Sequence, residues 1–204
     1  MNILIPMAGA GSRFQKAGYP FPKPLIDING KPMIQWVLES LQLNGKYIFI
    51  VQKEHYEQYD LKSLLNIIAP NCEIILTEGL TEGAACTTLL AEKFINNDDP
   101  LLISNADQYI KWNSTDTIMN FMENELSGGL LTFESIHPKH SFAKIEGNNI
   151  VTEVAEKKVI SNNATVGIYF WKKGSEYVKY ANDMIKKNIR TNNEFYICPV
   201  YNQA

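Results

Sequence analysis

Apolar positions along the chain fall into two kinds of run, and the two kinds alternate. Compact apolar runs of four or five residues predict buried strands at residues 2–6, 47–51, 72–76 and 101–104, and a longer run predicts another at residues 129–136. Apolar residues spaced three and four apart predict helices at residues 33–41, 56–68, 82–95 and 115–126. Strands that alternate with helices predict an α/β fold with a mostly parallel sheet covered by helices on both faces.

The pattern changes after Pro138. Three short apolar runs follow, at residues 143–146, 150–154 and 166–171, and asparagine-rich turns join them. Such runs are typical of antiparallel strands, so we expect a small antiparallel cap on the first half of the chain. One more helix is predicted at residues 177–189. No repeat, linker or low-complexity tract divides the chain, which predicts a single domain over residues 1–204.

Composition narrows the class of protein. Of 204 residues 45% are hydrophobic and 20% are charged, as in soluble globular proteins, and the net charge of -3 disfavours a nucleic-acid partner. The apolar N-terminal run has no basic flank or cleavage site, and it is too short for a signal peptide or a membrane span. Three cysteines without a CxxC pair suit a reducing compartment. We therefore expect a cytoplasmic protein without a membrane partner; homo-oligomerisation stays open.

A glycine-containing loop follows the first predicted strand. It reads Ala8-Gly9-Ala10-Gly11-Ser12-Arg13. Glycines let the backbone approach a ligand and aim N–H groups at phosphate. A Rossmann dinucleotide loop would need a glycine where Phe14 stands, and a Walker A loop would need a Gly-Lys-Ser/Thr triplet that the chain lacks. The remaining interpretations are a loop that grips a triphosphate and an ordinary surface turn.

Two basic residues favour the triphosphate interpretation. Of the 19 lysines and arginines only Arg13 and Arg190 are arginines, and the guanidinium of Arg13 could bind two phosphate oxygens at once. Lys23 lies between Pro22 and Pro24, which restrict the backbone and could aim its ammonium at a phosphate. A solvated lysine in a turn is the alternative.

Three blocks of sequence resemble the signature of the sugar-phosphate nucleotidyltransferases, also called nucleoside-diphosphate-sugar pyrophosphorylases. They are residues 9–13, 23–25 and 30–34, which read Gly-Ala-Gly-Ser-Arg, Lys-Pro-Leu and Gly-Lys-Pro-Met-Ile. The blocks follow one another in the family's order, and the resemblance extends more faintly beyond residue 110. It implies a glycosyltransferase-A-like (Rossmann-like) three-layer fold, Mg²⁺ as cofactor, and as substrates a nucleoside triphosphate and a phosphorylated small-molecule acceptor.

The predicted strand at residues 101–104 ends in a polar tripeptide that leads to Asp107. Ligands of open α/β sheets bind at the carboxyl ends of strands. The resemblance implies that Asp107 binds the metal and that Asn105 and Gln108 orient it or contact the ribose. A cap on a turn is the alternative role for this aspartate.

Residues 79–87 resemble the base-binding turn of the family and the helix after it. In that case Gly79, Glu82 and Gly83 would contact the nucleotide, and the base would lie on the bare backbone of Gly83. The alternative is a helix N-terminus with small packing residues.

The acceptor side is predicted only through the resemblance. Glu156 and Lys157 match a Glu-Lys pair whose lysine faces the acceptor phosphate and whose glutamate faces its polar groups. Gly167 matches a turn on the same side. Without the resemblance, such a charge cluster is usually just solvated.

The chain departs from the family near its last helix, where many members bring a second aspartate to the metal. Glu194 or Asn202 could replace it, or the metal could rely on Asp107, phosphates and waters. Family members usually continue with another strand and helix beyond this point, so a shortened C-terminus stays open.

The predicted reaction is an in-line displacement in which an acceptor phosphate attacks the α-phosphorus and pyrophosphate leaves. It needs positioned cations more than a base, because the nucleophile is already an anion. Arg13 would hold the leaving pyrophosphate, Lys23 the α-phosphate, and Lys157 the acceptor phosphate. Alternatives are a glycosyltransferase of the same broad fold and a non-catalytic nucleotide sensor.

The first 25 residues most resemble members from capsule and surface-polysaccharide gene clusters, which include cytidylyltransferases that act on phosphoglutamine. This likeness favours CTP among the pyrimidine triphosphates, with UTP or dTTP as alternatives. It leaves phosphoglutamine and a sugar phosphate as acceptors.

Overall fold

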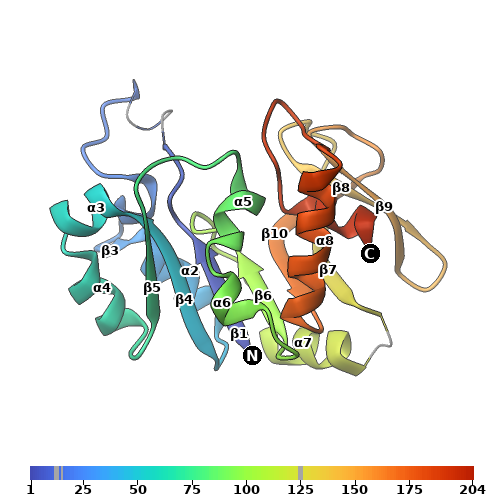
Figure 1. Cartoon of the computed structure of the whole chain (residues 1–204), viewed down its shortest axis with the longest axis horizontal. Helices are drawn as coiled ribbons and strands as arrows, with labels where there is room; N and C mark the ends of the chain where they lie inside the picture. Colours follow the sequence, from blue (N-terminus) through green and yellow to red (C-terminus); the bar gives the residue numbers. More distant parts are fainter. Residues whose placement is uncertain (12–13, 15, 124–125) are drawn as a thin grey trace.

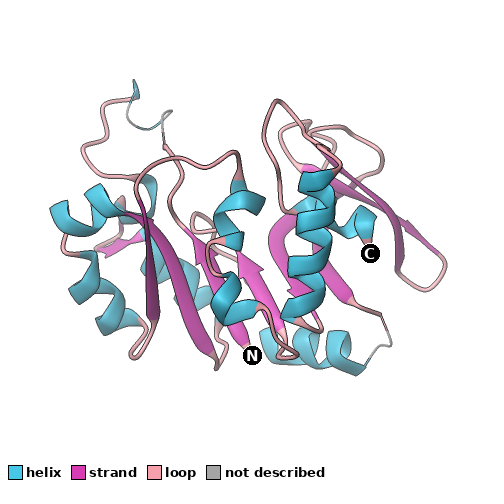
Figure 2. Cartoon of the chain, in the orientation of Figure 1, coloured by secondary structure: helices cyan, strands magenta, loops and turns pink. Residues whose placement is uncertain are grey.

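The computed structural model describes residues 1–11, 14, 16–123 and 126–204. A single sheet of eight strands runs through the molecule, with helices on both of its faces (Figures 1 and 2). Its strands are β1 (Asn2–Pro6), β4 (Lys46–Gln52), β5 (Glu73–Thr77), β6 (Leu101–Ser104), β7 (Gly128–Glu134), β8 (Ser141–Glu146), β9 (Ile150–Glu156) and β10 (Asn163–Trp171). A separate two-stranded hairpin joins β2 (Asp27–Ile28) to β3 (Lys31–Pro32).

The sheet divides into a parallel and an antiparallel part. Its order is β5-β4-β1-β6-β10-β8-β9, with β7 also pairing with β10. The three pairings among β5, β4, β1 and β6 are parallel, and every pairing beyond β6 is antiparallel. The expected α/β fold, with a mostly parallel mixed sheet and a small antiparallel part, is confirmed.

One strand departs from the predicted alternation. The run after the fourth helix forms β7, but this strand lies antiparallel to β10. A strand-helix-strand pattern does not fix the direction of a strand whose partner comes later in the chain. The pairing also shifts register between Thr165 and Tyr169, where β10 bends.

Seven α-helices cover the sheet among the described residues. They are α2 (Met33–Leu41), α3 (Lys53–Gln58), α4 (Leu61–Ile68), α5 (Ala84–Leu89), α6 (Glu92–Ile95), α7 (Ser114–Glu123) and α8 (Gly174–Lys186). Two 3₁₀ helices, η1 (Lys23–Leu25) and η2 (Cys198–Gln203), complete the structure. No helix in the described part of the chain is long and apolar enough to cross a membrane.

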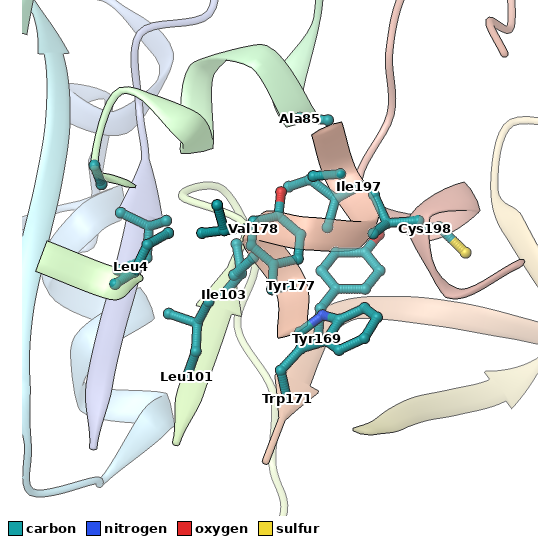
Figure 3. Close-up of a cluster of buried hydrophobic side chains, with 14 of the residues drawn as sticks. Leu4, Ala85, Leu101, Ile103, Tyr169, Trp171, Tyr177, Val178, Ile197 and Cys198 are labelled. Carbon is teal, nitrogen blue, oxygen red and sulfur yellow. The ribbon is translucent and has the colours of Figure 1, made fainter. Parts of the chain in front are cut away.

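Each central strand is buried on both faces, as its nearly continuous apolar run predicts. On β1, Ile3 and Ile5 belong to a core cluster with α2, α4 and α7, and Leu4 between them belongs to the cluster on the opposite face. That second cluster contains residues of α5, α6, α8 and η2. Figure 3 shows part of it, including Trp171 and Tyr177. In Figure 1, α5, α6 and α8 lie in front of the sheet and α2 lies behind it.

Two predicted helices are each interrupted. The predicted helix at residues 56–68 is two helices, because Asp60 takes a left-handed conformation with a φ of 44°. The one predicted at 82–95 begins only at Ala84, since Gly83 has a φ of 128°, and it breaks between α5 and α6. The apolar spacing continues across both breaks, so the pattern located the buried face but not the interruptions.

Candidate active site

The candidate site lies where the parallel strands end. The glycine loop follows the carboxyl end of β1, and the side chain of Gln52, at the end of β4, holds it. The Gln52 amide nitrogen donates to the carbonyl oxygens of Ala8 at 2.8 Å and Gly9 at 3.4 Å. Ala8 is buried, and Gly9 and Ala10 are exposed. The predicted phosphate loop is therefore anchored at its start and open to solvent at Gly9 and Ala10.

Two members of the predicted phosphate loop, Ser12 and Arg13, lie outside the described residues. Gly11 precedes them with a φ of 58°, a left-handed conformation that favours glycine. A side-chain carbon at Gly11 would lie 3.8 Å from the backbone nitrogen of Lys23. The end of the loop therefore lies against the segment that carries the predicted α-phosphate lysine.

Lys23 and Asp107 form an ion pair that joins two distant parts of the sequence. Lys23 lies in η1, where the backbone of Leu25 donates to Pro22 at 2.8 Å, and the Lys23 ammonium lies 5.3 Å from the ring centre of Phe14. Both charged side chains remain partly exposed, at 28% for Lys23 and 33% for Asp107. The two residues predicted to act on phosphate and metal thus lie together, within reach of solvent.

The turn after β6 lies directly against β10. The backbone N–H of Asn105 donates to the carbonyl oxygen of Gly167 at 3.0 Å, and the Gln108 side chain donates to the same oxygen at 3.2 Å. Gly167 has a φ of 88°, and a Cβ there would lie 2.2 Å from the Asn105 amide nitrogen. The positive φ favours glycine, and the close approach places the predicted acceptor turn beside the loop of Asp107.

The predicted base-binding turn contacts a segment near the C-terminus. Gly83 lies so close to Phe195 that a Cβ would meet its backbone nitrogen and oxygen at 2.5 Å. Phe195 donates its N–H to the carbonyl of Glu82 at 2.8 Å and accepts one from Ala85 at 2.9 Å. Packing therefore accounts for the glycine at position 83. Ala85, next to this turn, is fully buried in the core.

Side chains reinforce this contact. The Glu82 carboxylate pairs with Arg190 at 2.6 Å, and the Arg190 guanidinium lies 3.9 Å from the ring centre of Phe195. On the other side of the turn, the Thr77 hydroxyl donates to the carbonyl of Gly79 at 2.8 Å. The carboxylate of Glu82, predicted to bind nucleotide, is thus engaged with the protein itself.

The predicted acceptor pair lies at the end of β9. Glu156 is partly buried and accepts a hydrogen bond from the Ser141 hydroxyl. Burial raises the pKa of the Glu156 carboxyl, and the Ser141 hydrogen bond and the charge of Lys157 partly oppose that rise in pKa. Lys157 is exposed, has a φ of 55°, and donates from its ammonium to the hydroxyl of Tyr196.

The two candidates for a second metal ligand, Asn202 and Glu194, each interact with other groups of the protein. Both ends of the Asn202 amide bind the backbone of Val154: the side-chain oxygen accepts from the Val154 N–H at 2.9 Å and the nitrogen donates to the Val154 carbonyl at 2.8 Å. The asparagine thus clamps η2 to β9. Glu194 affects the ionisation of Tyr196. Burial is the main cause that raises the pKa of the Tyr196 phenol, and the Glu194 carboxylate raises that pKa further.

The donor set at Asp107 fits magnesium bound through few protein ligands. Among the described residues, no cluster of three or more His, Cys, Asp or Glu side chains could hold a metal by itself. Mg²⁺ commonly keeps several waters and binds through one or two carboxylates together with substrate phosphates. Asp107 offers such a carboxylate, partly exposed at the end of β6.

The sequence patterns did not predict four residues of the site. Gln52, Ser141, Arg190 and Tyr196 each hold a predicted site residue or its loop. Gln52 could have been found from its place at the end of a buried strand. Ser141, Tyr196 and Arg190 bind partners that lie 15 to 108 positions away in the sequence, and no local pattern links them to those partners.

The family model described as "Nucleotidyl transferase" matches residues 3–201. The chain belongs to this family. Membership covers the whole arrangement just described, from the glycine loop after β1 to η2. It also agrees with the resemblance of the three N-terminal blocks.

Relatives within the family are distant. A bifunctional protein GlmU of Methanococcus maripaludis is 29% identical over 178 residues, which are 83% of this chain and 39% of that protein. The low-salt glycan biosynthesis nucleotidyltransferase Agl11 of Haloferax volcanii is 25% identical over 83% of this chain and 48% of its own length. The chain thus spans less than half the length of these relatives.

Solved structures agree on the fold. A nucleoside-diphosphate-sugar pyrophosphorylase from Vibrio cholerae has a TM-score of 0.81 at 23% identity, covering 98% of this chain and 86% of the other. An inositol-1-phosphate CTP transferase from T. maritima has a TM-score of 0.75 at 16% identity, covering 98% and 79%. At such identities the likeness concerns the architecture alone.

Proposed function

We propose that the protein transfers a nucleoside monophosphate from a nucleoside triphosphate to a phosphorylated small molecule and releases pyrophosphate. The observation that carries the proposal is the pairing of Lys23, in η1, with Asp107, which follows the carboxyl end of β6. A partly exposed cation and anion at this edge can exchange their mutual contact for a phosphate and a divalent metal. Family membership and the relatives named for nucleotidyl transfer support the same activity.

The nucleotide side and the acceptor side of the site each have a part in the proposed reaction. The loop from Ala8 to Arg13 binds the triphosphate, with Arg13 on the leaving pyrophosphate and Lys23 on the α-phosphate. Asp107 holds Mg²⁺, which would neutralise charge on the phosphates when bound. Lys157 binds the acceptor phosphate and Glu156 its polar groups. Because the acceptor phosphate is already an anion, positioning and charge stabilisation suffice for in-line attack.

The nucleotide of this proposal is a pyrimidine triphosphate, with CTP preferred. The turn at residues 79–83 offers backbone donors and acceptors, and a shelf of this kind can read the edge of a small base. The choice of cytosine, an acceptor such as phosphoglutamine or a sugar phosphate, and a place in capsule or surface-polysaccharide synthesis come from the resemblance. An ordinary sugar-nucleotide pyrophosphorylase that uses UTP or dTTP is the second candidate, favoured by the relatives named GlmU.

The test is a pyrophosphate-release assay with Mg²⁺. CTP, UTP, dTTP, ATP and GTP are each offered with glucose 1-phosphate, N-acetylglucosamine 1-phosphate and phosphoglutamine, and the Asp107→Asn variant is the control. We expect release with a pyrimidine triphosphate and at least one acceptor. Faster release with ATP or GTP would contradict the pyrimidine preference. Equal use of CTP and UTP would contradict only the cytidine preference, and no release with any pair would contradict the transferase.

A further inference from the structure

Tyr196 contacts Lys157, the predicted acceptor lysine, and directly follows Phe195, which contacts the predicted nucleotide turn. Its hydroxyl accepts a hydrogen bond from the Lys157 ammonium, which lies 4.4 Å from the centre of its ring. The Glu194 carboxylate also acts on this hydroxyl, whose pKa it raises in addition to burial. Tyr196 is partly buried, in contrast with the exposed lysine that it holds.

A lysine side chain needs a hydrogen-bond partner of this kind to hold its ammonium at one position. Its four-carbon side chain has about 2 kcal/mol of rotamer entropy to lose when it is fixed. The backbone of Lys157 is already set, since its N–H donates to the carbonyl of His140 at 3.0 Å and its φ is 55°. The Tyr196 hydroxyl takes one of three ammonium protons and leaves two for a phosphate.

The residue before Tyr196 ties this contact to the nucleotide turn. Phe195 is hydrogen bonded to Glu82 and Ala85, and Arg190 lies against its ring. Residues 190–196 therefore form one strut, from the turn at Glu82 to the ammonium of Lys157. A tyrosine at the end of this strut has a fixed position relative to the nucleotide.

We propose that Tyr196 is the positioning residue of the acceptor site, which holds the Lys157 ammonium at a set place relative to the bound nucleotide. This role rests on the proposed function, in which Lys157 binds the acceptor phosphate. Tyr196 itself touches neither phosphate. It acts by restricting the lysine, so it affects acceptor binding and leaves binding of the triphosphate unchanged.

Kinetics of Tyr196→Phe test the role. The variant keeps the ring and removes the hydroxyl. The acceptor of highest turnover in the panel above should show a KM raised about tenfold, the scale of one hydrogen bond to a charged group. The KM for the triphosphate should stay within twofold. In a Lys157→Ala background the same change should have no further effect. Tyr180→Phe is the matched control, because Lys179 also lies over its ring, at 5.0 Å.

An unchanged or lowered acceptor KM in Tyr196→Phe would overturn the proposal. So would a rise that persists fully in the Lys157→Ala background, since the tyrosine would then act without the lysine.

A measurement without substrate separates this proposal from the reaction itself. Brief acetylation with acetic anhydride, read by mass spectrometry, compares Lys157 with its neighbour Lys158. The labelling ratio of Lys157 to Lys158 should rise several-fold in Tyr196→Phe and further in Tyr196→Leu, with melting temperatures as the check on folding. A ratio equal to that of the wild type in both variants would overturn the positioning role. If no triphosphate and acceptor pair reacts, the proposed function fails, and this ratio still decides whether Tyr196 holds Lys157.

Discussion

The two halves of the site are built in different ways. On the nucleotide side, the glycine loop and Asp107 directly follow β1 and β6, two neighbouring parallel strands. On the acceptor side, Glu156 ends an antiparallel strand, Gly167 lies in the bend of another, and Tyr196 reaches Lys157 from a loop 39 residues away. The first half uses the ends of a regular sheet, and the second depends on long-range contacts.

This difference indicates, for each half, whether a substitution should affect chemistry, binding or stability. Parallel strands deliver their loops to one edge whatever the loops contain, so changes there should affect chemistry more than folding. The acceptor half holds its residues through Phe195, Tyr196 and Asn202, which also join secondary-structure elements. Changes there should affect both binding and stability.

The largest effect is expected at Asp107. Asp107→Asn keeps the size of the side chain but removes the charge that pairs with Lys23 and that we propose binds Mg²⁺. Magnesium-dependent pyrophosphate release should be abolished while the melting temperature changes little. Asp27→Asn is the control, because Asp27 accepts a turn hydrogen bond from Gly30 at 3.1 Å that asparagine can also accept. Near-normal turnover in Asp107→Asn would exclude it as the principal metal ligand.

Lys23→Ala should have the next largest effect. Loss of one charge partner of the transition state lowers turnover by roughly two powers of ten. Steady-state kinetics with saturating triphosphate measures this. Lys31→Ala is the matched control: Lys31 lies at the end of the adjacent hairpin and pairs with Glu39 at 2.8 Å. Wild-type turnover in Lys23→Ala would show that η1 does not reach the triphosphate.

Gly83→Ala should damage the contact between the halves. Its Cβ would meet the backbone of Phe195 at 2.5 Å, and a φ of 128° strains any other residue. We expect a loss of about 2 kcal/mol, or about 4–8 °C in melting temperature, with higher KM values for both substrates.

Gly79→Ala, in the same turn, meets nothing within 4 Å and should keep the melting temperature of the wild type. If Gly83→Ala raised only one KM, the strut would not connect the two sides.

The smallest effect is expected at Glu156, and it depends on pH. Burial raises the pKa of this carboxyl above 4.5 in the folded protein, so the native state binds more protons than the unfolded state between the two pKa values. Stability attributable to Glu156 is present below pH 4.5 and is lost as pH rises through the folded pKa. Glu156→Gln should therefore be more stable than the wild type at pH 8, with an advantage that shrinks towards pH 4.

Urea unfolding at several pH values measures this, and Glu153→Gln, exposed on the same strand, is the control. An advantage of Glu156→Gln that does not vary with pH would mean that ionisation of the buried carboxyl is not its cause.

The sequence by itself determined the parallel half of the fold. Nearly continuous apolar runs predicted strands at Asn2–Pro6 and Leu101–Ser104 with the bounds that the structure has, because a strand buried on both faces leaves no polar position inside it. The same regularity predicted that the glycine loop and Asp107 would share one edge of the sheet. Lys23, the ion-pair partner of Asp107, was predicted to bind phosphate from the prolines beside it and from the resemblance.

Only the tertiary structure decided the acceptor half and the links between the halves. The direction of β7 depends on β10, which comes later in the chain, and the left-handed Asp60 interrupts a helix whose apolar spacing continues. Asn202, one of two candidates for a second metal ligand, clamps η2 to β9. The contact of Tyr196 with Lys157 is invisible in a periodic pattern, because such a pattern records which face of each element is buried, whereas the partner of a single polar side chain is set by how distant elements meet.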